Sequence, residues 1–186
     1  FQGVDEAGNI TTKTVTFTID TTAPEVTVTG VDNGEHYNTA VTPVITVSGE
    51  TSKTVMLNGE LWVPTEITAE GTYTLVVTAE DAAGNLTTVT VEFTIDTTAP
   101  VIEVTGVDNG EHYNTSVTPS ITVSGETSKT ITLNGAQFVS GTEITEEGEY
   151  TLLVTAEDAA GNITTVTVEF TIDLTAPEVT VTGVDD

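Results

Sequence analysis

The 186-residue chain has no cysteine and no arginine, and three lysines are its only strong bases. Without cysteine the fold cannot be held by disulfides, so a small extracellular domain would need another kind of cross-link. Against 29 acidic residues, the three lysines leave a formal net charge of −26. Nucleic acids and anionic membranes are bound through lysine and arginine contacts to phosphate, so we expect neither as a partner. A surface this acidic attracts cations instead.

Long apolar runs and a helical period are also missing. No apolar stretch approaches the roughly 18 to 20 residues that span a bilayer, and no signal peptide is recognisable. We therefore expect a mature or excised segment of a longer chain, without direct membrane insertion. Threonine and β-branched residues alternate with a period of two, and 37% of all residues are hydrophobic. This pattern favours a folded all-β protein over a disordered acidic chain.

The chain does contain an internal repeat. TIDTTAP stands at 18–24 and again at 94–100, so the first two aspartates are 96 − 20 = 76 residues apart. Residues 20–95 align with 96–172 with about fifteen substitutions and one insertion. We predict four segments, namely the C-terminal strands of a preceding repeat (1–20), two complete repeats (21–96 and 97–173) and the first strand of a following repeat (174–186).

Each complete repeat is predicted to form roughly six or seven short strands. In the first repeat, Asn58 and Gly59 supply the two positive φ angles of a type I′ hairpin within 53–63. Tyr73 and, in the second repeat, Tyr150 follow Glu-Gly-x with the spacing of a tyrosine corner, although an ordinary turn before a core tyrosine would read the same. The other strands of this repeat are predicted over 24–30, 41–49, 65–68, 73–80 and 86–95.

These motifs resemble a known family. DAAGN in a loop, then a final strand and IDTTAP, looks like the tandem bacterial immunoglobulin-like (Ig-like) repeats of cell-surface proteins, including the extender regions of large adhesins. The loop GVDNGEHYNTAVTP at 30–43 is similar to a stretch in one branch of that family. The resemblance covers all 186 residues. It implies an all-β chain of tandem immunoglobulin-like β-sandwich domains arranged end to end, in an extracellular protein of the cell surface or cell wall.

In a sandwich of the implied topology, acidic side chains from separate loops meet at each linker. Related adhesin extenders are rigidified there by Ca²⁺, and the resemblance implies the same here, with carboxylate oxygens as ligands. The alternative is that the aspartate of DAAGN bonds to amides of its own turn, that Asp20 caps a linker turn and that Glu50 pairs with Lys53. The predicted metal ligands are Asp20, Asp32, Glu50, Asp81, Asp96, Glu126, Asp158 and Asp173.

The function predicted from the sequence is mechanical. We expect a structural, non-catalytic extender or stalk of a microbial, adhesin-like surface protein, with Ca²⁺ between its domains. Its partners would be neighbouring repeats of the same chain, and other copies if it forms a surface array. His36 and His112 have no second histidine or cysteine in their repeats, so we expect no zinc or catalytic site. Two other functions stay open, a subunit of an extracellular filament or S-layer and a carbohydrate-binding accessory module.

Overall fold

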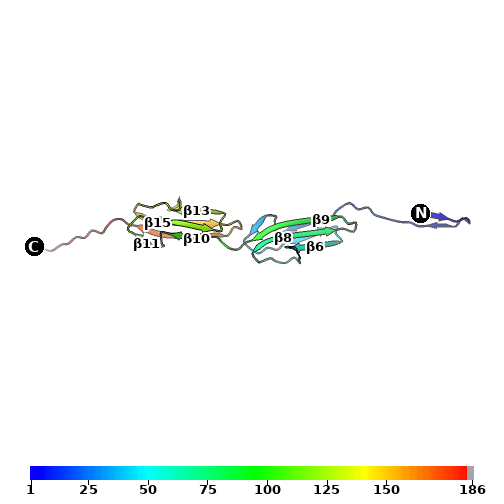
Figure 1. Ribbon diagram of the computed structural model, residues 1–186, viewed down its shortest axis with the longest axis horizontal. Coiled ribbons are helices and arrows are strands. Elements are labelled where there is room, and N and C mark those ends of the chain that lie inside the picture. The colour runs from blue at the N-terminus through cyan, green and yellow to red at the C-terminus, as the bar shows by residue number, and fades with distance from the viewer. Residues whose placement is uncertain (184–186) are drawn as a thin grey trace. The chain divides into compact units, whose positions relative to one another are not determined.

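The computed structural model describes residues 1–183, and every regular element in that range is a β-strand (Figure 1). Within it, nothing helical has the length and apolar character of a membrane span. The strands are β1 (Gln2–Val4), β2 (Ile10–Thr12), β3 (Glu25–Thr29), β4 (Glu35–Tyr37), β5 (Val44–Ser48), β6 (Ser52–Leu57), β7 (Glu60–Leu61), β8 (Gly71–Glu80), β9 (Leu86–Ile95), β10 (Val101–Thr105), β11 (Glu111–Tyr113), β12 (Ser120–Ser124), β13 (Ser128–Leu133), β14 (Ala136–Gln137), β15 (Gly148–Glu157) and β16 (Ile163–Ile172).

Each complete repeat is built from a small sheet and a larger one. In the first repeat β3 pairs with β5, and the larger sheet has the order β4-β9-β8-β6-β7. In the second repeat β10 pairs with β12, and the larger sheet has the order β11-β16-β15-β13-β14. In both, the edge strand β4 or β11 runs parallel to the last strand of the repeat. The prediction of an all-β chain of tandem Ig-like sandwiches is confirmed.

The chain separates into two compact units whose boundary does not fall at the linker. One unit comprises Phe1–Asn33, Thr42–Glu66 and Tyr73–Glu92, and the other comprises Gly34–Val41, Ile67–Thr72 and Phe93–Asp186. Residues 96–100, which connect the two complete repeats, therefore lie inside one unit. The same unit contains the second repeat and the segments 34–41 and 67–72 of the first.

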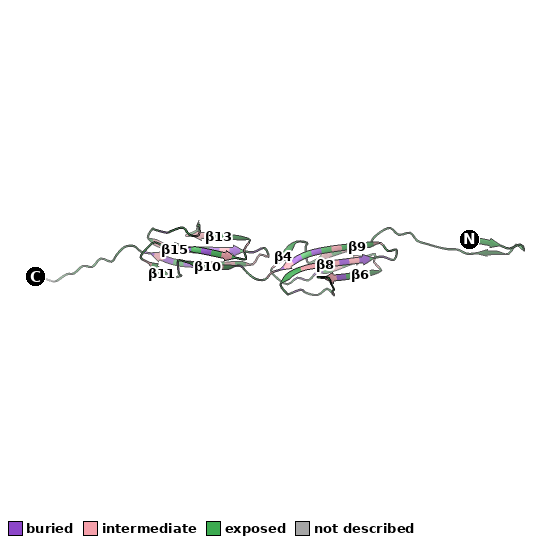
Figure 2. Ribbon diagram, in the orientation of Figure 1, coloured by how far each residue is buried: buried purple, intermediate pink, exposed green. Residues whose placement is uncertain are grey.

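Strict alternation along the long strands builds the core of each repeat. On β8, Leu75, Val77 and Ala79 are fully buried, and the residues between them are more exposed. Figure 2 shows this alternation along β8 and β9. In the second repeat the ring of Phe170 stacks on Tyr150, with ring centroids 5.3 Å apart. Period-two patterning thus places one face of each sheet in the core and the other in solvent.

Two local predictions are confirmed. Asn58 and Gly59 join β6 to β7 with φ angles of 52° and 83°, as a type I′ turn requires. The hydroxyl of Tyr150 donates to the carbonyl of Glu146 at 2.9 Å, which closes a tyrosine corner in the second repeat.

One strand prediction is wrong and another is too long. Residues 65–68 form no strand but a single bridge, Val41↔Ile67. The strand predicted over 41–49 begins only at Val44, because Pro43 has no N–H to donate to a ladder. Conversely, β4 lies in a segment that the sequence analysis treated as a loop, and it pairs in parallel with β9 through His36↔Thr94.

The two ends of the chain carry little regular structure. Residues 1–20 contain the short hairpin β1-β2, and residues 13–24 and 174–183 contain no strand. The final residues 184–186 of the segment predicted over 174–186 lie outside the described residues.

Candidate functional site

The candidate site is the linker, the DTTAP segment that follows the last strand of a repeat. The backbone N–H of Asp96 donates to the carbonyl of Tyr37 at 2.9 Å, and that of Asp173 donates to the carbonyl of Tyr113 at the same distance. This bond continues the parallel pairing of β9 with β4 by one residue beyond the strand. The first residue of the linker is therefore still bound to the repeat that it leaves.

A glutamate of the repeat being left holds the next two linker residues. Oε1 of Glu70 accepts hydrogen bonds from the N–H of Thr97 and from the hydroxyl of Thr98, each at 2.9 Å, and also from the hydroxyl of Thr97. These bonds, those from the threonine hydroxyls foremost, hold the pKa of Glu70 below its ordinary value. Oε1 of Glu147 repeats the pattern after the second repeat, accepting from the N–H of Leu174 at 2.6 Å and the hydroxyl of Thr175 at 2.7 Å.

Glu70 and Glu147 are linker residues that the sequence alone did not identify. Both are the acid of the Glu-Gly-x-Tyr motif, which was read only as a tyrosine corner. The signal that could have identified them is an acid at the same place in both repeats, immediately before a glycine, where core packing does not require it.

On the other side of the linker stands the DAAGN turn of the repeat being entered. Oδ1 of Asp158 accepts from the N–H groups of Ala160 and Asn162, each at 2.9 Å, and Oδ2 accepts from the side-chain amide of Asn162 at 2.8 Å. Asp158 and its counterpart Asp81 are buried, at 6% and 8% exposure. Such a carboxylate is tolerated in the protein interior because N–H donors replace the water that it loses.

The hydrogen bonds of the DAAGN turn favour the charged form of its aspartate. Burial raises the pKa of Asp158, but the bonds from the Asn162 side chain and from the turn amides outweigh it, so this pKa lies below its ordinary value. The hydrogen bond from the Asn85 side chain is the largest cause of the same lowering of the pKa at Asp81. Both loops therefore hold ionised carboxylates at neutral pH.

The asparagine of the same turn reaches the linker. Nδ2 of Asn162 donates to the backbone carbonyl of Asp96 at 2.7 Å, and the hydroxyl of Thr164 donates to the carbonyl of Pro100 at 2.6 Å. Both ends of the linker are thus bound to the repeat that it enters. The first linker shows the same bonds, from Asn85 to Asp20 at 3.0 Å and from Thr87 to Pro24 at 2.6 Å.

The predicted calcium ligands mostly bond to protein donors near them in the chain. Oδ1 of Asp20, of Asp96 and of Asp173 each accepts from the N–H two residues later, at 3.0 Å. Glu126 forms an ion pair with Lys129 at 2.9 Å, and this contact lowers the pKa of Glu126. Glu50 is half-buried and Asp32 is exposed.

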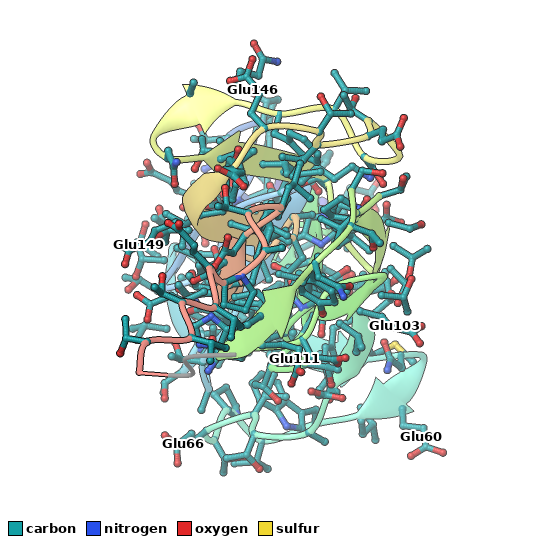
Figure 3. The ribbon with its side chains drawn as sticks, turned by 90° about the vertical axis from the view of Figure 1, so that its left-hand side faces the viewer. Glu60, Glu66, Glu103, Glu111, Glu146 and Glu149 are labelled. Carbon is teal, nitrogen blue, oxygen red and sulfur yellow. The ribbon has the colours of Figure 1, made fainter. Side chains whose placement is uncertain are left out.

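A calcium ion needs about six to eight oxygen ligands at roughly 2.3 to 2.6 Å. Among residues 1–183, no three acidic or histidine side chains are grouped so that they could hold a metal ion. In Figure 3 the labelled glutamates Glu103, Glu146 and Glu149 of the second repeat lie at different sides of the ribbon. The predicted ligands therefore do not fit a calcium site in this arrangement, and calcium binding itself stays a prediction.

Two family models match the sequence of this chain. One for the bacterial Ig-like domain matches residues 22–97, which run from before β3 to just beyond β9. Another, for the bacterial Ig-like domain of group 3, matches residues 62–143, from the late strands of the first repeat into the second. The chain is a tandem array of bacterial Ig-like repeats. Curated proteins gave no significant match to it.

Several solved structures of other proteins are similar to these Ig-like repeats. A tetra-tandem repeat from the extending region of a large adhesion protein shares 19% identity (TM-score 0.40; 93% of this chain, 55% of that one). A Ca²⁺-stabilized adhesin with which an Antarctic bacterium binds ice shares 23% (TM-score 0.34; 92% and 55%). SGBP-B of the Bacteroides ovatus mixed-linkage glucan utilization locus, in complex with a heptasaccharide, shares 16% (TM-score 0.33; 82% and 48%). The chain spans about half the length of these proteins, and likeness at this level carries no functional information.

Proposed function

We propose that these Ig-like repeats form a structural, non-catalytic spacer in a bacterial cell-surface protein. The observation that carries the proposal is the bonding at Asp96, whose N–H is bound to the repeat that it leaves and whose carbonyl is bound to the repeat that it enters. Because the residues of this connection recur at each repeat, copies can be added without new contacts. That property suits a protein whose task is to hold another domain away from the cell.

The charge of the chain supports a partner within the same chain. A net charge of −26 keeps separate copies apart through mutual repulsion. Neighbouring repeats meet instead through the linker hydrogen bonds, in which neutral side chains donate to backbone carbonyls. Repulsion between copies, together with hydrogen bonding between repeats of one chain, favours a spacer over a filament subunit with lateral contacts between copies.

Calcium at the linkers, as the family resemblance implies, is not required by this proposal. Most of the carboxylates predicted as ligands accept hydrogen bonds from nitrogen donors, and those of residues 1–183 are not grouped around a common point. The spacer proposal and the calcium prediction are therefore tested separately.

Fusions displayed on living bacteria test the spacer proposal. The chain is placed between a cell-wall anchor and a small binding module, and capture of a bulky bead-bound target is measured. A Gly/Ser coil of the same 186 residues serves as the length control, since its root-mean-square span is about 70 to 80 Å. We expect capture to rise above both the coil and a direct fusion. Equal capture by all three fusions would refute the proposal.

A further inference from the structure

Each DAAGN loop binds a backbone carbonyl of the linker through one asparagine nitrogen. In the second repeat, Nδ2 of Asn162 donates to Oδ2 of Asp158 at 2.8 Å and to the carbonyl oxygen of Asp96 at 2.7 Å. A side-chain amide has two N–H groups, and both are used here. The equivalent atoms of the first repeat belong to Asn85, Asp81 and Asp20, at 2.8 and 3.0 Å.

This nitrogen stands where a cation would have to bind. A divalent ion that joined Asp158 to the carbonyl of Asp96 would take the position between the two oxygens, and a neutral NH₂ group already bridges them. Oδ1 of Asp158 is taken by two backbone N–H groups. The buried carboxylate is thus satisfied by hydrogen bonds alone, which accounts for the poor fit of the site to calcium.

A third copy of the loop shows that the turn forms from its own residues. Asp5 accepts from the N–H groups of Ala7 and Asn9 at 2.9 and 2.8 Å, and from the side-chain amide of Asn9 at 2.7 Å. This copy stands ahead of the first linker, yet its internal bonds match those of the other two. The asparagine is therefore positioned by the turn before it binds a linker, which lowers the entropy cost of that contact.

We propose that each DAAGN loop is a metal-independent binding site for the incoming linker. Its ligand is the backbone carbonyl of the aspartate that ends the preceding repeat, and its asparagine selects that carbonyl in place of a cation. The inference deepens the proposed function and rests on it, because a spacer needs a defined connection between its repeats.

Spin labels test this directly, because a chain without cysteine can be labelled at chosen sites. Thr46→Cys and Thr122→Cys put one label on an exposed strand position of each complete repeat. The width of the distance distribution is measured in EDTA and in millimolar Ca²⁺. We expect one narrow width in both buffers, and a broader distribution in both after Asn162→Ala. Asn9→Ala, which removes the same turn bond ahead of both linkers, should leave the width unchanged.

Amide hydrogen exchange gives a second readout of the same bond. The N–H of Thr98 donates to Oδ1 of Asp96, whose carbonyl Asn162 holds. In Asn162→Ala we expect its exchange in EDTA to be faster by about five- to tenfold, the factor given by loss of one ordinary hydrogen bond.

If Asn162→Ala abolishes the melting transition of the second repeat, Asn162→Asp keeps the side-chain shape while removing the N–H donors. It also sets a second carboxylate beside Asp158, so we expect the width then to depend on Ca²⁺. A width in the unsubstituted chain that is narrow only with Ca²⁺, or broad in both buffers, would overturn the inference. A distance distribution that stays narrow in EDTA in both the Asn162→Ala and the Asn162→Asp variant would also overturn the inference. The display experiment uses the unsubstituted chain and measures capture, so the two proposals can fail independently.

Discussion

Replacing Gly106 by alanine should destabilise the second repeat more than replacing Gly110, although both glycines have a positive φ, at 83° and 79°. A Cβ on Gly106 would collide with the carbonyl oxygen of Thr118 and lie 3.2 Å from its carbonyl carbon. A Cβ on Gly110 would meet nothing within 4 Å. The two variants therefore share the backbone strain and differ only in the collision.

The difference can be sized from these contacts. The left-handed conformation costs an alanine roughly 1 to 2 kcal/mol relative to glycine, so this is the expected loss for Gly110→Ala. The obstacle at Gly106 is the backbone carbonyl of Thr118, which cannot rotate away as a side chain could. Forcing an extra methyl group against it costs about 1 to 3 kcal/mol more. Gly106→Ala should then lose about 2 to 5 kcal/mol in total.

Differential scanning calorimetry of the whole chain measures this difference. For a domain of 60 to 100 residues, each kcal/mol shifts Tm by about 4 to 8 °C, so the two variants should be clearly separated. The first repeat offers an independent replicate, since a Cβ on Gly30 would lie 2.5 Å from the carbonyl oxygen of Thr42 while one on Gly34 would meet nothing. Equal Tm losses within each pair would show that φ alone, and not the close approach, requires glycine.

Three further predictions concern the linkers. Folding lowers the pKa values of Glu70 and Asp158, so these groups stabilise the fold above their ordinary pKa values of 4.5 and 3.8 and lose that contribution as pH falls through the lower folded values. Thermal melts should therefore show a Tm plateau above about pH 5 and a decline below about pH 4. A Tm that rises on acidification would contradict this. Thr164→Val removes the hydroxyl bond to Pro100 and should lower the free energy of unfolding in denaturant by about 1 kcal/mol. The control Thr167→Val, on an exposed position of β16, should lower it less. Equal losses in the two variants would count against the bond. Adding millimolar Ca²⁺ to an EDTA-treated sample should leave Tm unchanged, and a Tm that climbs steadily with Ca²⁺ would support the calcium prediction instead.

The strands and the β6-β7 hairpin could be predicted because their signals are local. Alternation decides which face of β8 is buried, and Asn-Gly at 58–59 specifies its turn within two residues. β4 could not be predicted in this way. Its three residues show no alternation, and its partner β9 pairs with it through Thr94, 94 − 36 = 58 residues after His36. Only the folded arrangement of the sheets supplies that pairing.

The place of the DAAGN aspartates could be predicted from the sequence, whereas the calcium chemistry assigned to them stays a prediction. Asp81 and Asp158 do lie beside linkers, as the repeat pattern indicated. What the residue types leave undecided is whether a carboxylate oxygen accepts from N–H groups or binds a cation, because both uses need the same lone pairs. That choice depends on where the asparagine four residues later points. The letters of DAAGN do not specify this direction, since it is set by the turn and by the linker packed against it.

The two halves of each connection have an evolutionary consequence. The acceptor, the carbonyl of Asp96, is encoded at the end of one copy, and the donor, Asn162, is encoded within the next. When unequal crossing-over inserts or deletes a whole copy of the coding segment, every new boundary again places such an aspartate ahead of such an asparagine. The number of repeats, and with it the length of the protein, can therefore change while each boundary stays chemically matched.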